Sequence, residues 1–459
     1  MNAPVVRLFA LVIVLFGLLV AFTSRWTVFE AEALRENPNN RRLLFEEQLI
    51  KRGVIRTADG DVIAGNRSLP GERFERRYPA GPLFSHPVGF TSLDRGRIGL
   101  EEYYNDPLTG RRTDAIGALE RLLGPQKIGD DLRTTLSTRA QEVAYEGLAD
   151  RRGAVVALDV ETGAVRVMAA TPTFDPTDPR DAETFNRATQ ARLPPGSTMK
   201  VVTAAAALDS GRFRPDSQVD GSNGKEISGT PLDNFGGEDF GMIDLTTALT
   251  NSVNTAWASV AEELGKETMG EYMRKFGFFE DPPMDYPDEQ MVPSGEYGPR
   301  GRLLAPTSDQ IDVGRMAIGQ DKLLVTPLQM ATVAQTVANG GVRMEPRLVE
   351  KIVDPDGRTI DEPLPDEAER VMSEDNANAL AGMMRNVVEQ GTGTAAQLEG
   401  VDVSGKTGTA EVGDGTDNLW FIGFTDQVAV AVMLERQTGG TGGGDAAPIA
   451  AQVLQALGE

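Results

Sequence analysis

The stretch PPGSTMKVVTAAAALDSG, residues 194–211, contains a helix start, a helix with almost no polar face and a helix end. The residues before Ser197 cannot continue a helix, whereas residues 198–208 are apolar on nearly every side. This pattern predicts a buried central helix that ends near Gly211. Ser197 and Lys200 share one helical face, with Cβ atoms about 5–6 Å apart, so the lysine amine can reach the serine hydroxyl. The helix N-terminus adds positive partial charge there.

The composition restricts how such a serine could be activated. The chain of 459 residues contains one histidine, His86, and no cysteine. A Ser-His-Asp triad, a cysteine nucleophile and a Cys/His zinc site all need residues that His86 alone cannot supply. A lysine must therefore be the base if a serine is activated, and we expect neither a metal nor a cofactor. We interpret His86, beside Pro87, as a loop residue rather than a ligand.

Two further short motifs follow along the chain. Ser252-Val253-Asn254 lies between helical patterns at residues 245–249 and 255–264, which predicts a junction between two helices. Lys406-Thr407-Gly408-Thr409 precedes two apolar segments that are typical of strands, so this motif is predicted on a strand of the same sheet. A glycine inside a strand lets a ligand or another backbone approach closely.

Each motif taken alone also has a purely structural interpretation. Ser197 could be a helix N-cap and Lys200 a solvated lysine, while the other two motifs could be a capping turn and a β-bulge. Ser222 and Lys225 repeat the Ser-x-x-Lys spacing within a turn, where the two side chains have no fixed relation. The ordered occurrence of all three motifs therefore matters more than any one of them.

The motifs Ser-x-x-Lys, Ser-x-Asn and Lys-Thr-Gly, in that order, resemble those of the penicillin-binding proteins. The resemblance extends along nearly the whole chain, for example to Asn186-Arg187-Ala188, to VTPLQM at 325–330 and to WFIGF at 420–424. Val253 stands where the family pattern can have aspartate, which the pattern tolerates because the outer serine and asparagine make the contacts. The chain is most similar to class B, the monofunctional transpeptidases.

The resemblance implies a catalytic role for several motif residues. Ser197 would be the nucleophile that becomes acylated, and Lys200 would be its general base. Lysine is a poor base at its reference pKa of about 10.4, so burial and the like charge of Lys406 would have to lower the pKa of Lys200. Ser252 would relay the proton toward the leaving amine, and Asn254 would hold the backbone of the donor peptide.

The resemblance also implies how the substrate is gripped. Lys406, Thr407, Gly408 and Thr409 would bind the terminal carboxylate of the donor. The backbone N–H groups of Ser197 and Thr409 would form the oxyanion hole.

The activity implied is that of a D,D-transpeptidase, which takes a D-Ala-D-Ala stem peptide and crosslinks it to an amine of a neighbouring peptidoglycan strand. Such an enzyme is inhibited covalently by β-lactams and works in cell-wall synthesis, with cell division as the expected setting and division-machinery proteins as candidate partners. A D,D-carboxypeptidase or serine β-lactamase would use the same acylation but would need water for deacylation. A penicillin-binding sensor or scaffold is the third possibility.

Length and charge narrow the alternatives further. A chain of 459 residues suggests two or three domains, too few for a glycosyltransferase domain in addition. The formal net charge of −23 argues against nucleic acid and against a polybasic membrane patch.

We expect four segments along the chain. Residues 1–7 would be a short cytoplasmic tail, and residues 8–24 a transmembrane anchor, because 8–22 form an unbroken run of apolar residues and glycine. A cleaved signal peptide is the alternative for this run. Residues 29–130 would form a non-catalytic pedestal or docking domain. Residues 131–459 would be the transpeptidase domain, placed outside the cell membrane because the family works there.

The predicted fold is of the α+β class. A helix is expected at residues 138–148, followed by a strand hairpin at 153–160 and 164–170. With the Lys-Thr-Gly strand and the two strands after it, this gives a five-stranded antiparallel sheet with helices on both faces, the penicillin-binding and serine β-lactamase-like fold. The glycine-rich residues 439–444 are interpreted as a flexible turn before a final helix at 446–457.

Overall fold

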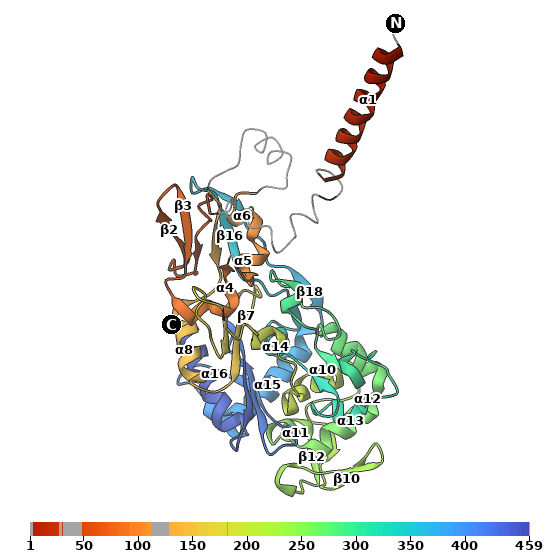
Figure 1. Ribbon diagram of the computed structural model, residues 1–459. Helices are drawn as coiled ribbons and strands as arrows, with labels where there is room; N and C mark the ends of the chain where they lie inside the picture. The colour runs from red at the N-terminus through yellow and green to blue at the C-terminus, as the bar shows by residue number, and fades with distance from the viewer. Residues whose placement is uncertain are drawn as a thin grey trace.

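The computed structural model describes residues 3–26, 30, 48–92, 94–111, 128–180 and 182–458. Figure 1 shows strands β2, β3 and β16 at one end of the body and helices α10 to α13 toward the other.

The larger part of the body is built on a five-stranded sheet whose order is β19-β20-β21-β7-β8. Every neighbouring pair in it is antiparallel. Its strands are β7 (Gly153–Asp159), β8 (Val165–Thr171), β19 (Ser404–Glu411), β20 (Asp417–Phe424) and β21 (Val428–Gln437). The predicted five-stranded antiparallel sheet is confirmed. In the described part of the chain β19 pairs on one side only, so it is an edge strand.

Alternate side chains of these strands enter two separate cores. On β7, Val155 and Ala157 belong to one core, whereas Ala154 and Val156 belong to the other. Successive side chains of a strand point to opposite faces, so a strand that is apolar at nearly every position must be covered on both sides. The continuous apolar runs in the sequence therefore require helices on both faces of the sheet.

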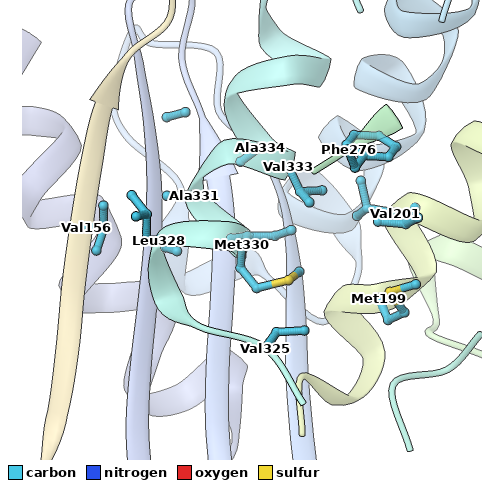
Figure 2. Close-up of a cluster of buried hydrophobic side chains, with 14 of the residues drawn as sticks. Val156, Met199, Val201, Phe276, Val325, Leu328, Met330, Ala331, Val333 and Ala334 are labelled. Atoms are coloured by element: carbon cyan, nitrogen blue, oxygen red, sulfur yellow. The ribbon is translucent and has the colours of Figure 1, made fainter. Parts of the chain in front are cut away.

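The helices on the two faces come from distant parts of the chain. Helices α8 (Thr138–Leu148) and α16 (Ala447–Gly458) contribute the apolar side chains of one core. On the other face, α14 (Pro327–Ala338) lies between the sheet and α10 (Lys200–Asp209). In Figure 2, Leu328 points toward Val156 of the sheet, while Val333 points toward Val201 of α10. Helix α10 is thus the buried central helix that the sequence predicts, and it is fixed against the sheet through α14.

A second sheet draws its strands from three separate regions of the chain. Its order is β17-β16-β6-β1-β2-β3. The strands are β1 (Ile55–Arg56), β2 (Val62–Leu69), β3 (Arg73–Arg77), β6 (Asp131–Thr134), β16 (Val349–Val353) and β17 (Thr359–Asp361). The expected domain boundary between residues 130 and 131 stays a prediction, because this sheet joins strands from both sides of it.

Shorter elements connect these layers. Near the second sheet lie η2 (Gly81–Phe84), α4 (Ser85–Val88), β4 (Thr91–Ser92), β5 (Gly96–Arg97), α5 (Leu100–Tyr103) and α6 (Asn105–Leu108). The middle of the chain forms α9 (Arg187–Gln190), η3 (Gly196–Met199), β9 (Gln218–Asp220), β10 (Lys225–Ile227), β11 (Thr230–Leu232), η4 (Phe235–Gly237), β12 (Met242–Asp244), α11 (Leu245–Thr250) and α12 (Asn254–Lys275). There follow η5 (Asp288–Gln290), β13 (Gly295–Glu296), η6 (Pro299–Gly301), α13 (Val313–Met316), β14 (Leu323–Leu324), β15 (Val342–Met344), β18 (Glu367–Arg370), α15 (Glu374–Gln390), η7 (Thr394–Ala396) and η8 (Gly442–Ala446).

Helix α1 (Ala3–Ser24) is the N-terminal apolar segment. It has 22 residues, none of them buried against the rest of the protein. Among the described residues it is the one helix long and apolar enough to cross a membrane. A helix with apolar side chains on all sides and no protein core around it is suited to a lipid environment.

His86 corrects one interpretation of the sequence. It lies in the short helix α4, not in a loop, and 1% of its surface is exposed. Its Nε2 lies 3.0 Å from the carbonyl oxygen of Pro172, and burial lowers its pKa to about 4. The histidine therefore packs as a neutral ring between the two parts of the body.

Arg52, Arg76 and Glu101 form a buried ion cluster near the second sheet. Glu101 Oε2 lies 2.8 Å from Arg52 Nη2, and Glu101 Oε1 lies 2.5 Å from Arg76 Nε. Burial alone would raise the pKa of Glu101, but the charges of Arg76 and Arg52 outweigh burial and lower it. Removing one member of such a cluster leaves the others charged and unpaired in a medium of low polarity.

Replacement of Glu101 by glutamine should therefore lower the free energy of unfolding by about 3–5 kcal/mol. Glu75→Gln is the matched control, because Glu75 also pairs with two arginines, Arg67 and Arg77, while its side chain is 40% exposed. Each of these exposed pairs should contribute at most about 1 kcal/mol. Chemical denaturation of the two variants measures the difference, and equal losses would show that the buried cluster adds no stability beyond a surface pair.

Candidate active site

The serine and lysine of the Ser-x-x-Lys motif lie at the start of the central helix. Residues Gly196–Met199 form the 3₁₀ helix η3, and the α-helix α10 begins only at Lys200. The α-helix therefore begins two residues later than the expected start at residue 198. A 3₁₀ helix has three residues per turn, so residues three apart lie directly above one another. This geometry brings Ser197 Oγ to 2.9 Å from Lys200 Nζ.

Ser252 and Asn254 lie at the junction between α11 and α12, as the sequence predicts. Asn254 begins α12, and Ser252 adopts a φ of +59°. This left-handed conformation costs a residue other than glycine about 1–2 kcal/mol. In this conformation the Ser252 carbonyl oxygen accepts a hydrogen bond from Lys200 Nζ at 2.6 Å. Strain of this kind persists where the surrounding structure enforces it, often at functional sites.

The partners of Lys200 suit an uncharged amine. Besides Ser197 Oγ, Lys200 Nζ contacts the Ser252 carbonyl oxygen at 2.6 Å and Asn254 Oδ1 at 2.7 Å. Both of these oxygens can only accept, and a neutral amine has two N–H groups and one lone pair. The two N–H groups are therefore used by the two shortest contacts, which leaves the lone pair for the hydroxyl proton of Ser197.

The electrostatic surroundings favour the same state. Burial and the nearby charge of Lys406 lower the pKa of Lys200 well below its usual range. Lys200 and Lys406 are both fully buried, and burial lowers the pKa of Lys406 to about 7. In the part of the chain that the structure describes, neither amine forms an ion pair with a carboxylate. The direction expected from the sequence for Lys200 is thus found, with burial as the larger cause.

The Lys-Thr-Gly motif lies on the edge strand β19. Lys406 Nζ donates to Ser252 Oγ at 2.9 Å and to the Thr407 carbonyl oxygen at 2.9 Å. Ser252 Oγ also lies 3.2 Å from Lys200 Nζ, so this hydroxyl connects the two amines. The Thr407 hydroxyl is hydrogen-bonded to the Thr392 hydroxyl at 2.6 Å.

A cavity of about 580 Å³ opens over these groups. Five of the eight residues singled out in the sequence line it, namely Ser197, Ser252, Asn254, Thr407 and Thr409. The two lysines lie beneath its wall. Gly408 allows its strand to lie close to the backbone of Pro195. A Cβ at this position would lie 2.7 Å from the carbonyl oxygen of Pro195.

Three glycines outside the sequence motifs also shape the site. Gly319 has a φ of +77°, and its carbonyl accepts the Gly196 N–H at 3.0 Å. Gly442 packs on the same strand as the motif, since its Cβ would lie 2.3 Å from the Gly408 carbonyl oxygen, and its N–H donates to Thr409 Oγ1 at 3.3 Å. Gly443 lines the cavity.

The second half of residues 439–444 is therefore not a flexible turn, because Gly442–Ala446 form the π-helical turn η8 against the motif strand. A run of glycines next to a strand is a signal of close backbone approach that could have indicated this contact.

Gly319→Ala should slow acylation of Ser197 by about 100-fold, because small misplacements of reacting groups have effects of this size. The new Cβ would lie 2.0 Å from the Gly196 carbonyl oxygen and would displace the nucleophile. Gly211→Ala is the control, since Gly211 has a similar φ of +70° but no atom within 4 Å of its Cβ position. The control should cost about 1–2 kcal/mol of stability and leave the rate unchanged. Equal rates for both variants in stopped-flow acylation would refute the role of Gly319.

Comparisons with known proteins agree with this geometry. Residues 153–455 match the penicillin binding protein transpeptidase domain, and residues 52–129 match the penicillin binding protein A dimerisation domain. The chain is 32% identical over 498 residues to the peptidoglycan D,D-transpeptidase PbpA of Mycolicibacterium smegmatis, with 99% of each chain covered.

Solved structures show the same similarity in three dimensions. The ceftriaxone acyl-enzyme complex of penicillin-binding protein A from M. tuberculosis superposes with a TM-score of 0.80 at 29% identity, covering 90% of this chain and 99% of that one. The D,D-transpeptidase domain of a peptidoglycan glycosyltransferase from Eggerthella lenta gives a TM-score of 0.78 at 30% identity, covering 89% and 98%. This chain belongs to the penicillin-binding protein transpeptidase family, with full-length relatives among the PbpA D,D-transpeptidases.

Proposed function

We propose that the protein is a peptidoglycan D,D-transpeptidase whose acyl-enzyme forms on Ser197. The observation that carries this assignment is the position of Lys200 Nζ, 2.9 Å from Ser197 Oγ, with both of its N–H groups engaged by oxygens that only accept. A buried amine arranged in this way is a general base at neutral pH. The family membership and the β-lactam acyl-enzyme structures of its relatives support the same chemistry.

Acylation would begin with transfer of the Ser197 hydroxyl proton to Lys200. The Ser197 oxygen forms a bond to the carbonyl carbon of the penultimate D-alanine, and the peptide bond to the terminal D-alanine breaks. The proton passes from Lys200 through Ser252 Oγ to the departing amine, which leaves as free D-alanine. Lys200 is then neutral again, and Ser197 carries the peptide as an ester.

Transfer to the acceptor would run the same steps in reverse. An acceptor amine forms a bond to the ester carbonyl carbon and gives a proton to Lys200 through Ser252. The bond to Ser197 oxygen then breaks, and Lys200 returns the proton to that oxygen. The product is a new peptide bond between two strands, and no other reactant is consumed.

Substrate binding would use the edge strand β19. An edge strand has unpaired backbone groups to which an extended peptide can add as a further strand. The hydroxyls of Thr407 and Thr409 and the charge of Lys406 would bind the terminal carboxylate. Asn254 would act mainly by holding Lys200, because its Nδ2 already donates to the Asp233 carbonyl oxygen at 3.0 Å.

The cellular setting forms part of the proposal. Helix α1 would anchor the protein in the cytoplasmic membrane, with residues 1–7 inside and the transpeptidase domain, from residue 131, outside. The pedestal at residues 29–130 would carry contacts to division-machinery proteins. A locally concentrated enzyme at the outer membrane face would meet nascent peptidoglycan directly.

Labelled penicillin should acylate Ser197 and no other serine, and the adduct should decay slowly, because a transpeptidase does not activate water efficiently. Intact mass and peptide mapping locate the label, and its decay is followed by mass over time. Ser222, which shares the Ser-x-x-Lys spacing, is the internal control, since its hydroxyl donates to Asp220 Oδ1 instead. Persistent labelling of Ser197→Ala would contradict the assignment, and rapid release would favour a β-lactamase.

Lys200→Ala and Lys406→Ala should change the pH dependence of acylation in different ways. The rate should rise with pH as Lys200 loses its proton and fall as Lys406, whose pKa is about 7, loses its charge. Lys200→Ala should lose about 10²–10⁴-fold in rate at every pH, because the base is gone. Lys406→Ala should shift the rising limb to higher pH, because the like charge that lowers the pKa of Lys200 is removed. Identical pH profiles for the two variants would show that their roles are not separate.

A further inference from the structure

A second cavity of about 320 Å³ adjoins the catalytic cavity. The two cavities share Asn234, Phe235, Asn251, Ser252 and Thr392 as lining residues. The second cavity extends away from Ser197 toward the end of α15 and the loop before β12, where its other lining residues are Glu238, Phe240, Val253, Gln390 and Gly391. Nothing in the acylation step described above requires this space.

The second cavity begins at the place where the leaving group of the proposed reaction departs. In the proposed reaction the departing D-alanine receives its proton beside Ser252, and its carboxylate would bind at Thr407. Thr407 is hydrogen-bonded to Thr392, and both Ser252 and Thr392 line the second cavity. By microscopic reversibility an attacking amine must arrive where the amine of D-alanine leaves. The remainder of an acceptor larger than D-alanine must therefore lie beyond Ser252 and Thr392, which is where this cavity begins.

The walls of the second cavity suit an amine on a flexible stem. Glu238 is the one titratable side chain among the described residues that line it. Phe235 is 78% exposed and offers an apolar surface at the border of both cavities. A carboxylate attracts a protonated amine, and an exposed aromatic ring can cover the apolar stem that carries it.

The loop that carries Phe235 and Glu238 is fixed by a buried asparagine. Asn234 Nδ2 donates to the carbonyl oxygens of Gly221 and Glu238 at 2.9 and 3.0 Å, and Asn234 Oδ1 accepts from the Thr255 backbone N–H at 3.1 Å. Asn234 is 4% exposed, so its amide is used entirely for these contacts. The loop is therefore tied to α12, the same helix that positions Asn254.

We propose that this second cavity is the acceptor pocket, which binds the amine-bearing side chain of the acceptor peptide. Glu238 draws in the protonated amine, which releases one proton to the solvent and then attacks as the neutral amine, giving its second proton to Lys200 through Ser252. The inference rests on the proposed transpeptidase function. It assigns Glu238 to selection of the acceptor and gives it no part in acylation. A small amine without net charge, such as free D-alanine, fills the place of the leaving group alone and does not use the pocket.

The test compares charge changes at two carboxylates of the full-length protein. Glu238→Gln and Glu238→Lys alter the second cavity, while Glu226→Gln and Glu226→Lys make the same changes at an exposed residue that lines neither cavity. Each variant is given a D-Ala-D-Ala stem peptide as donor and either a peptide with a side-chain amine or free D-alanine as acceptor. The rate of penicillin acylation is measured in parallel.

Glu238→Gln should raise the concentration of peptide amine needed for half-maximal transfer by about two- to five-fold, as expected for an exposed charge pair. Glu238→Lys should raise it further, and the increase should shrink at high salt because exposed charges are screened. Exchange with free D-alanine and acylation by penicillin should remain unchanged, and the Glu226 variants should use the peptide amine like the unaltered protein.

Three outcomes would overturn the inference. Glu238 and Glu226 variants could affect peptide transfer equally, exchange with free D-alanine could fall as much as peptide transfer, or the Glu238 variants could lose penicillin acylation. A failure of the unaltered protein to be acylated by penicillin would refute the proposed function instead, so the two failures are distinguishable.

Discussion

The interaction on which the site depends is the contact of a buried lysine amine with two oxygens that can only accept. Lys200 has no carboxylate partner among the described residues, so its burial is tolerable only if the amine loses its charge. The Ser252 carbonyl and Asn254 Oδ1 hold the neutral amine in one orientation and leave its lone pair toward Ser197. Other features of the site can be understood as means of keeping these atoms in place.

The backbone conformations that hold these atoms in place are strained or tightly packed, and the two apolar cores of the protein stabilise them. Ser252 adopts a left-handed φ, and Gly319 and Gly408 allow backbones to approach more closely than any side chain would permit. Each of these devices needs rigid surroundings, which the sheet supplies because its strands are buried on both faces. Helix α14 transmits that rigidity from the sheet to α10, and so to Ser197 and Lys200 (Figure 2). The precision of the site is therefore a consequence of the layered fold.

The sequence predicts those parts of the structure whose signals are local. Continuous apolar runs and the helical pattern at residues 138–148 predicted the five-stranded sheet and α8, and the three-residue spacing of Ser197 and Lys200 predicted their contact. What could not be predicted depends on residues far apart in the chain. Strand β16 pairs with β6 more than 200 residues away, and Thr392 reaches Thr407 only once α15 is packed beside β19. The close approach of Gly442 to Gly408 has the same origin.

The distribution of charge separates the two halves of the reaction. Both lysines of the site are fully buried, whereas the carboxylates Asp233, Glu411 and Asp417 lie on the walls of the catalytic cavity. In the proposed reaction a donor carboxylate would have to pass this acidic rim and would bind where Lys406 and the threonine hydroxyls replace its hydration. Its recognition would therefore depend on shape and hydrogen bonding. A protonated amine is attracted by the same acidic rim, because the negative potential raises the local concentration of cations. A chain with a net charge of −23 can thus favour amines at its surface while keeping the positive charge for the carboxylate inside. This arrangement would raise the local concentration of protonated amine acceptors near the acyl-enzyme.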